Sequence, residues 1–178
     1  MLSKKDYKLI ALLFFFLIYW LIKINADNNL LSKKEIETSS STNTVTVGVK
    51  RVIDGDTIEL ESGQKVRYIG IDTPETVAPN KPDGCFGKEA SAYAKLLLEN
   101  TKVRIEIDPA QGEFDKYGRH LGYVIMEDGT NFNLKLIEEG FAYEYTYNTP
   151  YKYQTEFKKA QADARANYKG LWAEDACY

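Results

Sequence analysis

The chain has 178 residues, which is enough for one domain and an extension. Hydrophobic residues make up 44% of it, with 13 Tyr and 8 Phe among them, so a packed core is expected. The formal net charge is −3, and because residues 1–37 contain six Lys against four acids, residues 38–178 carry a net charge of −5. Proteins that coat nucleic acids nonspecifically are usually basic, so the charge argues against that class. Any polyanion must therefore bind at one local site.

The N-terminus has the pattern of an export signal. Three Lys within the first eight residues precede fourteen uninterrupted apolar residues, Leu9–Ile22, which fits a signal peptide and is short for a membrane span. Ala26 is the one small residue of a poor cleavage site, whereas Tyr19 and Trp20 suit an interfacial membrane anchor. Residues 1–26 are therefore either a cleaved signal peptide or an anchor that attaches the protein to the membrane through residues 9–22. Both alternatives predict an extracytoplasmic protein, secreted or anchored.

A polar stretch at 27–43 predicts a flexible linker, so the domain itself is expected at 44–178. Alternation of β-branched residues predicts strands, and apolar residues at helical spacing predict helices. The expected strands are 44–52, 57–60, 65–71, 102–107 and 117–126, and the expected helices are 88–99, 131–139 and 149–168. This order favours a small closed barrel with helices packed on it over a parallel βαβ fold.

Two aspartates, Asp56 and Asp72, lie at predicted strand ends beside tight turns. If the second and third strands pair, both carboxylates can converge on one point, which is unfavourable for two like charges without a cation between them. Oxygen ligands favour Ca²⁺ or Mg²⁺ over softer metals. The alternative is that Asp54 and Asp56 only form a turn around Gly55.

Three further residues could serve phosphodiester chemistry. Glu75 follows Asp72 by three residues, and a carboxylate near a metal-bound phosphate can take a proton from water. Guanidinium groups match phosphate oxygens and stabilise the charge that develops on them, a role open to Arg67 and Arg119. The alternative for each is an ordinary solvent-exposed residue.

Four tyrosines lie close together at Tyr145, Tyr147, Tyr151 and Tyr153. Such rings can stack on nucleic-acid bases, and they can equally pack in the core or on the surface. A Ser-His-Asp or Cys-His mechanism is poorly supported, because His120 is the single histidine of the chain.

Cys85 and Cys177 are the two cysteines. In an exported protein such a pair suggests a disulfide, and the alternative is two buried free thiols. Two cysteines and one histidine cannot form an ordinary structural zinc site.

At these residues the chain resembles the staphylococcal nuclease (thermonuclease) family, from about Val47 to Trp172. Several separated motifs carry the resemblance in the same order. They are Ile53-Asp54-Gly55-Asp56-Thr57, Arg67 through Thr76, Phe86-Gly87-Lys88-Glu89-Ala90-Ser91, Asp115-Lys116-Tyr117-Gly118-Arg119 and Gly170-Leu171-Trp172.

The resemblance implies an α+β, mainly β fold, with a five-stranded OB-fold barrel and three packed helices. It also implies Ca²⁺-dependent hydrolysis of phosphodiester bonds in DNA and RNA. The resemblance also implies a role for each site residue. Asp56, Asp72 and the carbonyl of Thr73 would bind Ca²⁺, with Asp54 nearby, and Glu75 would be the general base. Arg67 and Arg119 would bind the scissile phosphate, and the nucleotide would be contacted by Lys81, Lys116, Tyr117 and Tyr145.

Departures from the family pattern keep other functions open. The domain is acidic, whereas the best-known family member is basic, so affinity for long polyanions should depend more strongly on Ca²⁺. The leading hypothesis is an exported, monomeric, Ca²⁺-dependent nuclease. The alternatives are a catalytically weak nucleic-acid-binding module of the cell envelope and an envelope protein whose barrel is purely structural.

Overall fold

The computed structural model describes Lys23 and residues 45–76 and 84–176. The chain divides into two units, Met1–Thr44 and Val45–Tyr178, and the fold below is that of the second. No helix among the described residues is long and apolar enough to cross a membrane. The predicted signal or anchor, the linker, Lys81 and Cys177 all lie outside the described residues.

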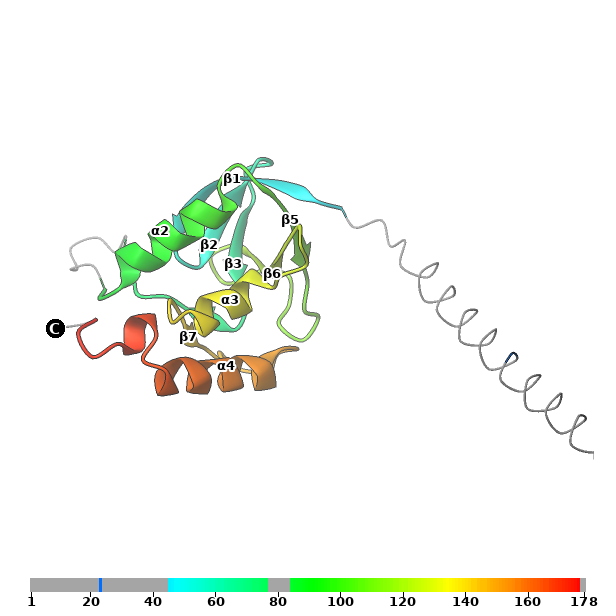
Figure 1. The fold of residues 1–178 in the computed structure, drawn as a ribbon. Coiled ribbons are helices and arrows are strands. Elements are labelled where there is room, and N and C mark those ends of the chain that lie inside the picture. The colour runs from blue at the N-terminus through cyan, green and yellow to red at the C-terminus, as the bar shows by residue number, and fades with distance from the viewer. Residues whose placement is uncertain (1–22, 24–44, 77–83, 177–178) are drawn as a thin grey trace, which may run out of the picture. The chain divides into compact units, whose positions relative to one another are not determined.

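Five strands form a closed barrel, which confirms the predicted architecture (Figure 1). Around the barrel the order is β1 (Val47–Asp54), β2 (Thr57–Leu60), β3 (Lys65–Tyr68), β6 (His120–Met126) and β5 (Lys102–Glu106), with β5 pairing back onto β1. All neighbours are antiparallel except β3 and β6, which run parallel. Closure leaves the five barrel strands without a free edge.

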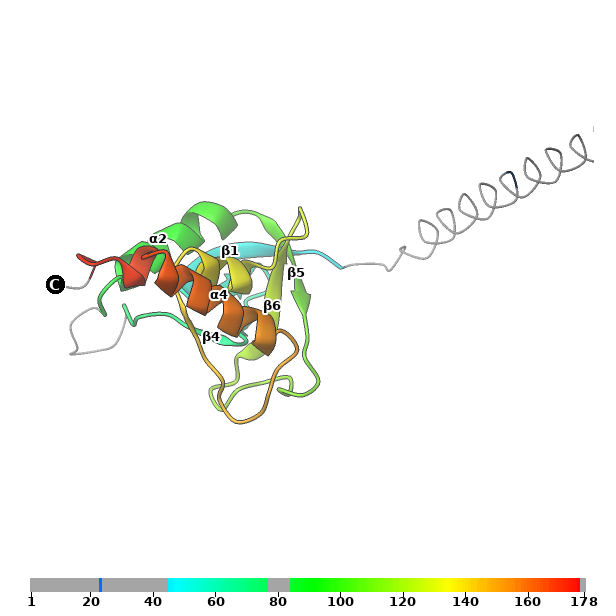
Figure 2. The same cartoon turned by 60° about the horizontal axis from the view of Figure 1, so that its bottom comes forward.

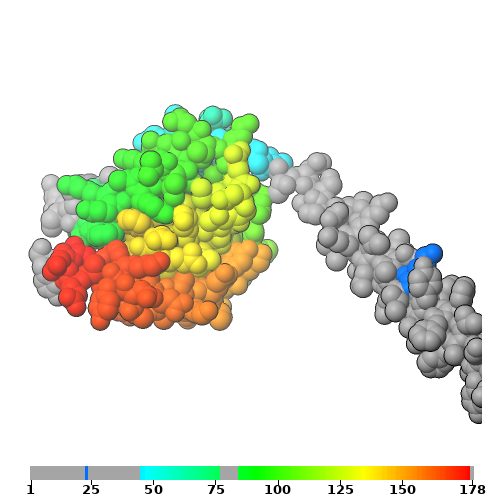
Figure 3. Space-filling view, in the orientation of Figure 1, coloured from blue at the N-terminus to red at the C-terminus, as the bar shows by residue number. Residues whose placement is uncertain are grey.

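Three helices pack on the barrel: α2 (Gly87–Leu98), α3 (Phe132–Glu138) and α4 (Gln154–Ala166). They are followed by the short 3-10 helix η1 (Gly170–Trp172). In the space-filling view α2, α3 and the C-terminal part of the chain cover one face of the domain (Figure 3). Helix α3 contacts α4, and α2 contacts β1.

Several predicted boundaries were wrong. The strand expected at 44–52 runs from Val47 to Asp54. The strand expected at 65–71 is interrupted by Gly70, whose φ of 80° ends β3 and starts the short strand β4 (Ile71–Asp72). Strand β4 pairs with β7 (Tyr143–Glu144), which the sequence did not predict. The strand expected at 117–126 starts at His120, and the last helix starts at Gln154 rather than at 149.

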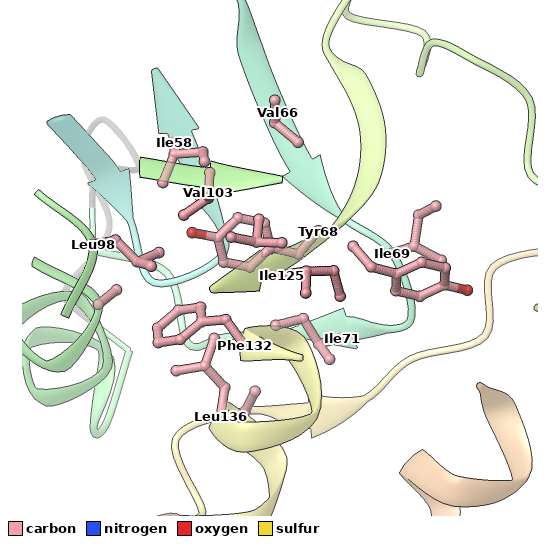
Figure 4. Close-up of a cluster of buried hydrophobic side chains, with 14 of the residues drawn as sticks. Ile58, Val66, Tyr68, Ile69, Ile71, Leu98, Val103, Ile125, Phe132 and Leu136 are labelled. Atoms are coloured by element: carbon pink, nitrogen blue, oxygen red, sulfur yellow. The ribbon is translucent and has the colours of Figure 1, made fainter. Parts of the chain in front are cut away.

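The core lies between the barrel and the helices (Figure 4). Apolar side chains from β2, β3, β5 and β6 point toward α2 and α3, where Leu98 and Phe132 meet them. The ring of Tyr68 contacts that of Phe132 edge to face, with 6.0 Å between centroids. Such contacts are favourable beyond the area they bury. This contact packs α3 against β3, the strand that carries Arg67.

A buried amide also joins α3 to the barrel. The side chain of Asn133 is fully buried. Its oxygen accepts the backbone N–H of Val124 at 3.0 Å, and its nitrogen donates to the carbonyls of Ile69 at 3.0 Å and Gly122 at 3.3 Å. Asn133 therefore ties β6 to the segment between β3 and β4, where the site described below is built.

Replacing this amide should destabilise the fold. We expect Asn133→Leu to lower the free energy of unfolding by about 2–4 kcal/mol, because buried groups left unpaired cost about 1–3 kcal/mol each. Urea unfolding monitored by circular dichroism measures this change. The matched control is Asn167→Leu, since Asn167 is exposed at the end of α4. An equal loss in both variants would contradict the special role of Asn133.

Candidate active site

Pairing across three barrel strands brings the predicted site residues together. Thr57 on β2 lies opposite Arg67 on β3, and Arg67 lies opposite Leu121 on β6. Arg119 comes two residues before Leu121, at the entry to β6. The parallel pairing of β3 with β6 therefore places both predicted phosphate-binding arginines at one end of the barrel.

Asp56 is buried in the turn between β1 and β2 and is fixed by Thr73. Its Oδ2 accepts hydrogen bonds from the backbone N–H and the hydroxyl of Thr73, both at 3.0 Å. Gly55 allows this approach, because a Cβ at that position would lie 2.8 Å from the Thr73 hydroxyl oxygen. The Asp-Gly-Asp segment thus forms a turn and also aims a carboxylate at a second segment, so it does more than reverse the chain.

Arg67 lies between the two predicted metal-binding aspartates. Its Nη1 is 3.1 Å from Asp56 Oδ2, and its Nη2 is 2.8 Å from Asp72 Oδ1. Nη1 also donates to the carbonyl of Ile71 at 3.0 Å. The Arg67 side chain is 14% exposed, so the alternative that Arg67 is an ordinary surface residue is wrong. Asp56 and Asp72 converge on one point, as the pairing of β2 with β3 predicted.

Negative charge is concentrated around this arginine. Burial, together with the charge of the adjacent Asp56 carboxylate, raises the pKa of Asp54 to about 7. Desolvation raises the pKa of Asp72 as well, and although Arg67 opposes this shift, the charges of Asp56 and Glu75 add to it. Raised carboxylate pKa values indicate that ionising all these groups together is unfavourable, which a bound cation would relieve.

The donor set suits a hard cation. Asp56, Asp72 and the carbonyl of Thr73 offer oxygen alone, which Ca²⁺ and Mg²⁺ prefer. Across residues 45–76 and 84–176, no three His, Cys, Asp or Glu side chains form a metal cage by themselves. An ion here would thus be bound by two carboxylates, a backbone carbonyl and water, which fits an open site that leaves room for a substrate oxygen.

Glu75, the predicted general base, lies on the segment that follows β4 and is exposed. Its carboxylate accepts the backbone N–H of Thr76 at 3.2 Å, and its charge acts on Asp72. Its backbone carbonyl accepts the N–H of Gly84 at 2.7 Å, just before α2 begins. Glu75 is therefore close enough to Asp72 to act on it, while its side chain remains accessible to water.

Arg119 is anchored by Asp115, an acid that the sequence reasoning did not assign to the site. Asp115 Oδ2 accepts Arg119 Nε at 2.7 Å, and Oδ1 accepts the backbone N–H groups of Tyr117 and Arg119 at 2.8 and 3.0 Å. Burial would raise the pKa of Asp115, but these hydrogen bonds outweigh it and lower the pKa. Asp115 therefore stays charged. The turn it stabilises, with Gly118 at φ 77°, is why β6 begins only after Arg119.

The segment that carries Arg67 and Asp72 and the segment that carries Arg119 line one cleft of about 610 Å³. Arg67, Asp72 and Arg119 line it together with the three predicted nucleotide contacts that the structure describes, Lys116, Tyr117 and Tyr145. Asp56 and Thr73 are buried behind this lining, and Glu75 lies outside it. The predicted site residues in the described part of the chain thus gather at one end of the barrel.

Aromatic rings form much of the cleft wall. Tyr117 is 73% exposed, and the cations of Lys116 and Arg119 lie 5.0 and 5.5 Å from its ring centroid. Tyr145 and Tyr147 are also exposed, with 6.4 Å between their ring centroids. The other two tyrosines of the cluster, Tyr151 and Tyr153, pack against Phe157 instead. Core packing therefore holds for Tyr151 and Tyr153, whereas base stacking by the exposed Tyr145 and Tyr147 stays a prediction.

The aromatic residues of the cleft belong to two loops, residues 107–119 and residues 145–153. The two loops lie side by side in Figure 2. Buried Asp108 accepts the Tyr123 hydroxyl at 2.9 Å and the Lys152 backbone N–H at 2.8 Å. Gln111 Nε2 donates to the carbonyl and the hydroxyl oxygen of Thr149, at 3.1 and 3.0 Å. The sequence did not predict these hydrogen bonds, because no local pattern indicates contacts between residues so far apart in the chain.

The predicted disulfide remains a prediction, because Cys177 lies outside the described residues. The sulfur of Cys85 lies 3.0 Å from the carbonyl oxygen of Ala176, the residue directly before Cys177. This proximity agrees with the proposed pairing of the long loop with the C-terminus.

Comparisons with known proteins identify the family to which the chain belongs. The family described as "Staphylococcal nuclease homologue" matches residues 65–174. Thermonuclease of Staphylococcus hyicus is 46% identical over 137 residues, which are 75% of this chain and 79% of that protein. Thermonuclease of Staphylococcus intermedius is 45% identical over 127 residues (70% and 74%), and Endonuclease YncB of Bacillus subtilis is 37% identical over 134 residues (73% and 63%). The chain belongs to the family of staphylococcal nuclease homologues, whose relatives named here are nucleases.

Proposed function

We propose that the protein is an exported, Ca²⁺-dependent nuclease that hydrolyses phosphodiester bonds of DNA and RNA. The observation that carries the proposal is the cleft, in which Arg67, Asp72 and Arg119 meet Lys116, Tyr117 and Tyr145. Cationic forks that suit a phosphate therefore lie beside exposed rings that suit a base. The names of the relatives, thermonuclease and endonuclease, support the same substrate class.

The chemistry starts from binding the phosphate. Arg67 and Arg119 each present a guanidinium to the cleft, and charge-assisted bonds to the phosphate oxygens stabilise the charge that grows on them as phosphorus gains a fifth oxygen. Ca²⁺, when held by Asp56, Asp72 and the Thr73 carbonyl, supplies Lewis-acid polarisation of a phosphate oxygen. Tyr117 and Tyr145 hold the neighbouring base and sugar in place.

Glu75 then activates water. Its carboxylate takes a proton as the water oxygen forms a bond to phosphorus, and the P–O ester bond on the opposite side breaks. The leaving oxygen takes a proton from solvent, so the products are a phosphomonoester and an alcohol. The exposure of Glu75 allows water to reach it.

Export is proposed from the N-terminal pattern of basic residues followed by the apolar stretch 9–22. The enzyme would then act outside the cytoplasm, as a secreted protein or one held at the membrane. The Cys85–Cys177 disulfide belongs to this proposal, because disulfides persist in oxidising compartments.

Metal removal tests the proposal directly. The purified protein should cleave single-stranded DNA and RNA at millimolar Ca²⁺, lose cleavage in excess chelator, and regain it when Ca²⁺ is restored. Gel electrophoresis of labelled oligonucleotides measures this. Identical cleavage in chelator would rule out the metal-based mechanism. A folded protein that binds the oligonucleotides with Ca²⁺ but never cuts them would favour the binding module instead.

Removing the general base should separate catalysis from binding. We expect Glu75→Gln to lower kcat by about 10²- to 10⁴-fold, the usual contribution of a positioned acid or base, because the amide cannot accept the proton. Ca²⁺ affinity, measured by calorimetry, should change little. Glu127→Gln is the matched control, since Glu127 is exposed just beyond the far end of β6 from Arg119. Full activity in Glu75→Gln would exclude Glu75 as the base.

The proposed export has its own measurement. Mass spectrometry of the protein from culture fluid and from membranes should find a chain shortened by about the first 26 residues if the signal is cleaved, as signal-peptide lengths suggest. A full-length chain in the membrane fraction would instead identify an uncleaved anchor. Full-length protein confined to the cytoplasm would contradict export.

A further inference from the structure

One buried hydroxyl, that of Thr57, links the two halves of the candidate active site. Thr57 is 2% exposed. Its Oγ1 donates to Asp56 Oδ1 at 3.1 Å and accepts a hydrogen bond from Arg119 Nη1 at 3.3 Å. The first partner belongs to the proposed cation site, and the second is a proposed phosphate ligand.

The direction of the bond from Arg119 is fixed by chemistry. Arg119 can only donate, so the Thr57 oxygen accepts its bond. The single Thr57 proton is left for a carboxylate, either Asp56 Oδ1 or the neighbouring Asp54, where a hydrogen bond from Thr57 opposes the rise in pKa caused by burial. The carboxylate polarises the hydroxyl and makes it a better acceptor for the guanidinium. The other oxygen of Asp56 is already occupied by Thr73 and Arg67. The Thr57 hydroxyl is therefore the partner of Asp56 Oδ1, whereas Thr73 and Arg67 are the partners of Oδ2.

The hydroxyl also relates Arg119 to the barrel. Asp115, the other anchor of Arg119, lies four residues away on the same loop, so that ion pair orients the side chain relative to its own loop. Thr57 lies 62 residues away in sequence, on β2, opposite Arg67 in the strand register. Its contact thus fixes the Arg119 guanidinium relative to Asp56 and Arg67.

We propose that Thr57 is a positioning residue, whose hydroxyl holds Arg119 in register with Asp56 so that both act on the same phosphate. This inference rests on the proposed nuclease function. It predicts that loss of the hydroxyl weakens turnover by misplacing Arg119, and that the cation site, where Thr73 still holds Asp56 Oδ2, is affected less than turnover.

The test compares Thr57→Val, Thr57→Ser and wild type in Ca²⁺, with cleavage of a single-stranded DNA oligonucleotide as the readout. Thr57→Val keeps the shape but removes the hydroxyl, and we expect kcat/KM to fall by about 10- to 100-fold, because small misplacements of a catalytic group cost up to that much. Thr57→Ser restores the hydroxyl and should recover most of the rate. Thr101→Val is the matched control, since the Thr101 hydroxyl caps α2 by donating to the Leu98 carbonyl at 2.8 Å.

A double-mutant cycle identifies the partner through which Thr57 acts. If it acts through Arg119, Thr57→Val should have little further effect in the Arg119→Ala background. Full additivity would overturn the inference. A Ca²⁺ affinity, measured by calorimetry without substrate, that falls as far as the rate in Thr57→Val would overturn it too, because the hydroxyl would then act on the cation site. Thermal unfolding checks that each variant is folded.

The outcomes separate this inference from the function beneath it. Wild-type protein that does not cleave in Ca²⁺ refutes the proposed function and the inference with it. Wild-type protein that cleaves while Thr57→Val cleaves equally well refutes the role of Thr57 alone. A loss in Thr57→Val that Thr57→Ser does not recover would show that packing around the side chain, and not the hydroxyl, is what matters.

Discussion

The site depends on the guanidinium of Arg67 lying between Asp56 and Asp72. Buried ion pairs seldom add net stability, because desolvating the charges costs about as much as their attraction returns. A barrel built for stability alone would do as well with apolar side chains here. The arrangement makes sense if one of its members is to act on a substrate. Two carboxylates share a single arginine, and Asp54 and Glu75 act on these carboxylates in turn, an excess of acidic groups that a bound cation would relieve.

The barrel makes this arrangement possible by bringing separate segments into register. Asp56 comes from the turn before β2, Arg67 from β3, Asp72 from β4 and Arg119 from the entry to β6. Arg119 lies two residues before Leu121, the β6 partner of Arg67, so the parallel pairing of β3 with β6 places both arginines at one end of the barrel. Asn133 holds β6 against the segment between β3 and β4. Rigid strands and a buried amide therefore set the spacing of charged groups that would otherwise repel or separate.

Much of this could be predicted from sequence, and what could not has a physical reason. Alternation and glycine-marked turns are local signals, so the barrel strands, the helices and the convergence of Asp56 with Asp72 were predicted. The break at Gly70 is local too, but a positive φ is one of several conformations open to glycine, and tertiary packing selects it. Strand β7 is two residues long, and it exists because β4 pairs with it. The periodicity of the sequence does not indicate which side chains form hydrogen bonds with one another. It therefore could not predict the role of Asp115 or the hydrogen bonds of Asp108 and Gln111.

Burial divides the site into a fixed part and an accessible part. Asp56, Thr57 and Thr73 are buried, and both threonines are hydrogen-bonded to Asp56, so the fold determines their positions before any ligand arrives. Glu75, Lys116 and Tyr117 are exposed, and they can adjust to a substrate. Arg67 and Arg119 stand between these parts, each held by an acid and each lining the cleft. In the proposed reaction the charges that must stabilise the transition state are therefore preorganised, whereas the groups that meet water and the base lie at the accessible surface. An acidic domain can act on a polyanion under these conditions, because attraction is confined to two oriented arginines, a cation and neutral rings, and does not require a basic surface.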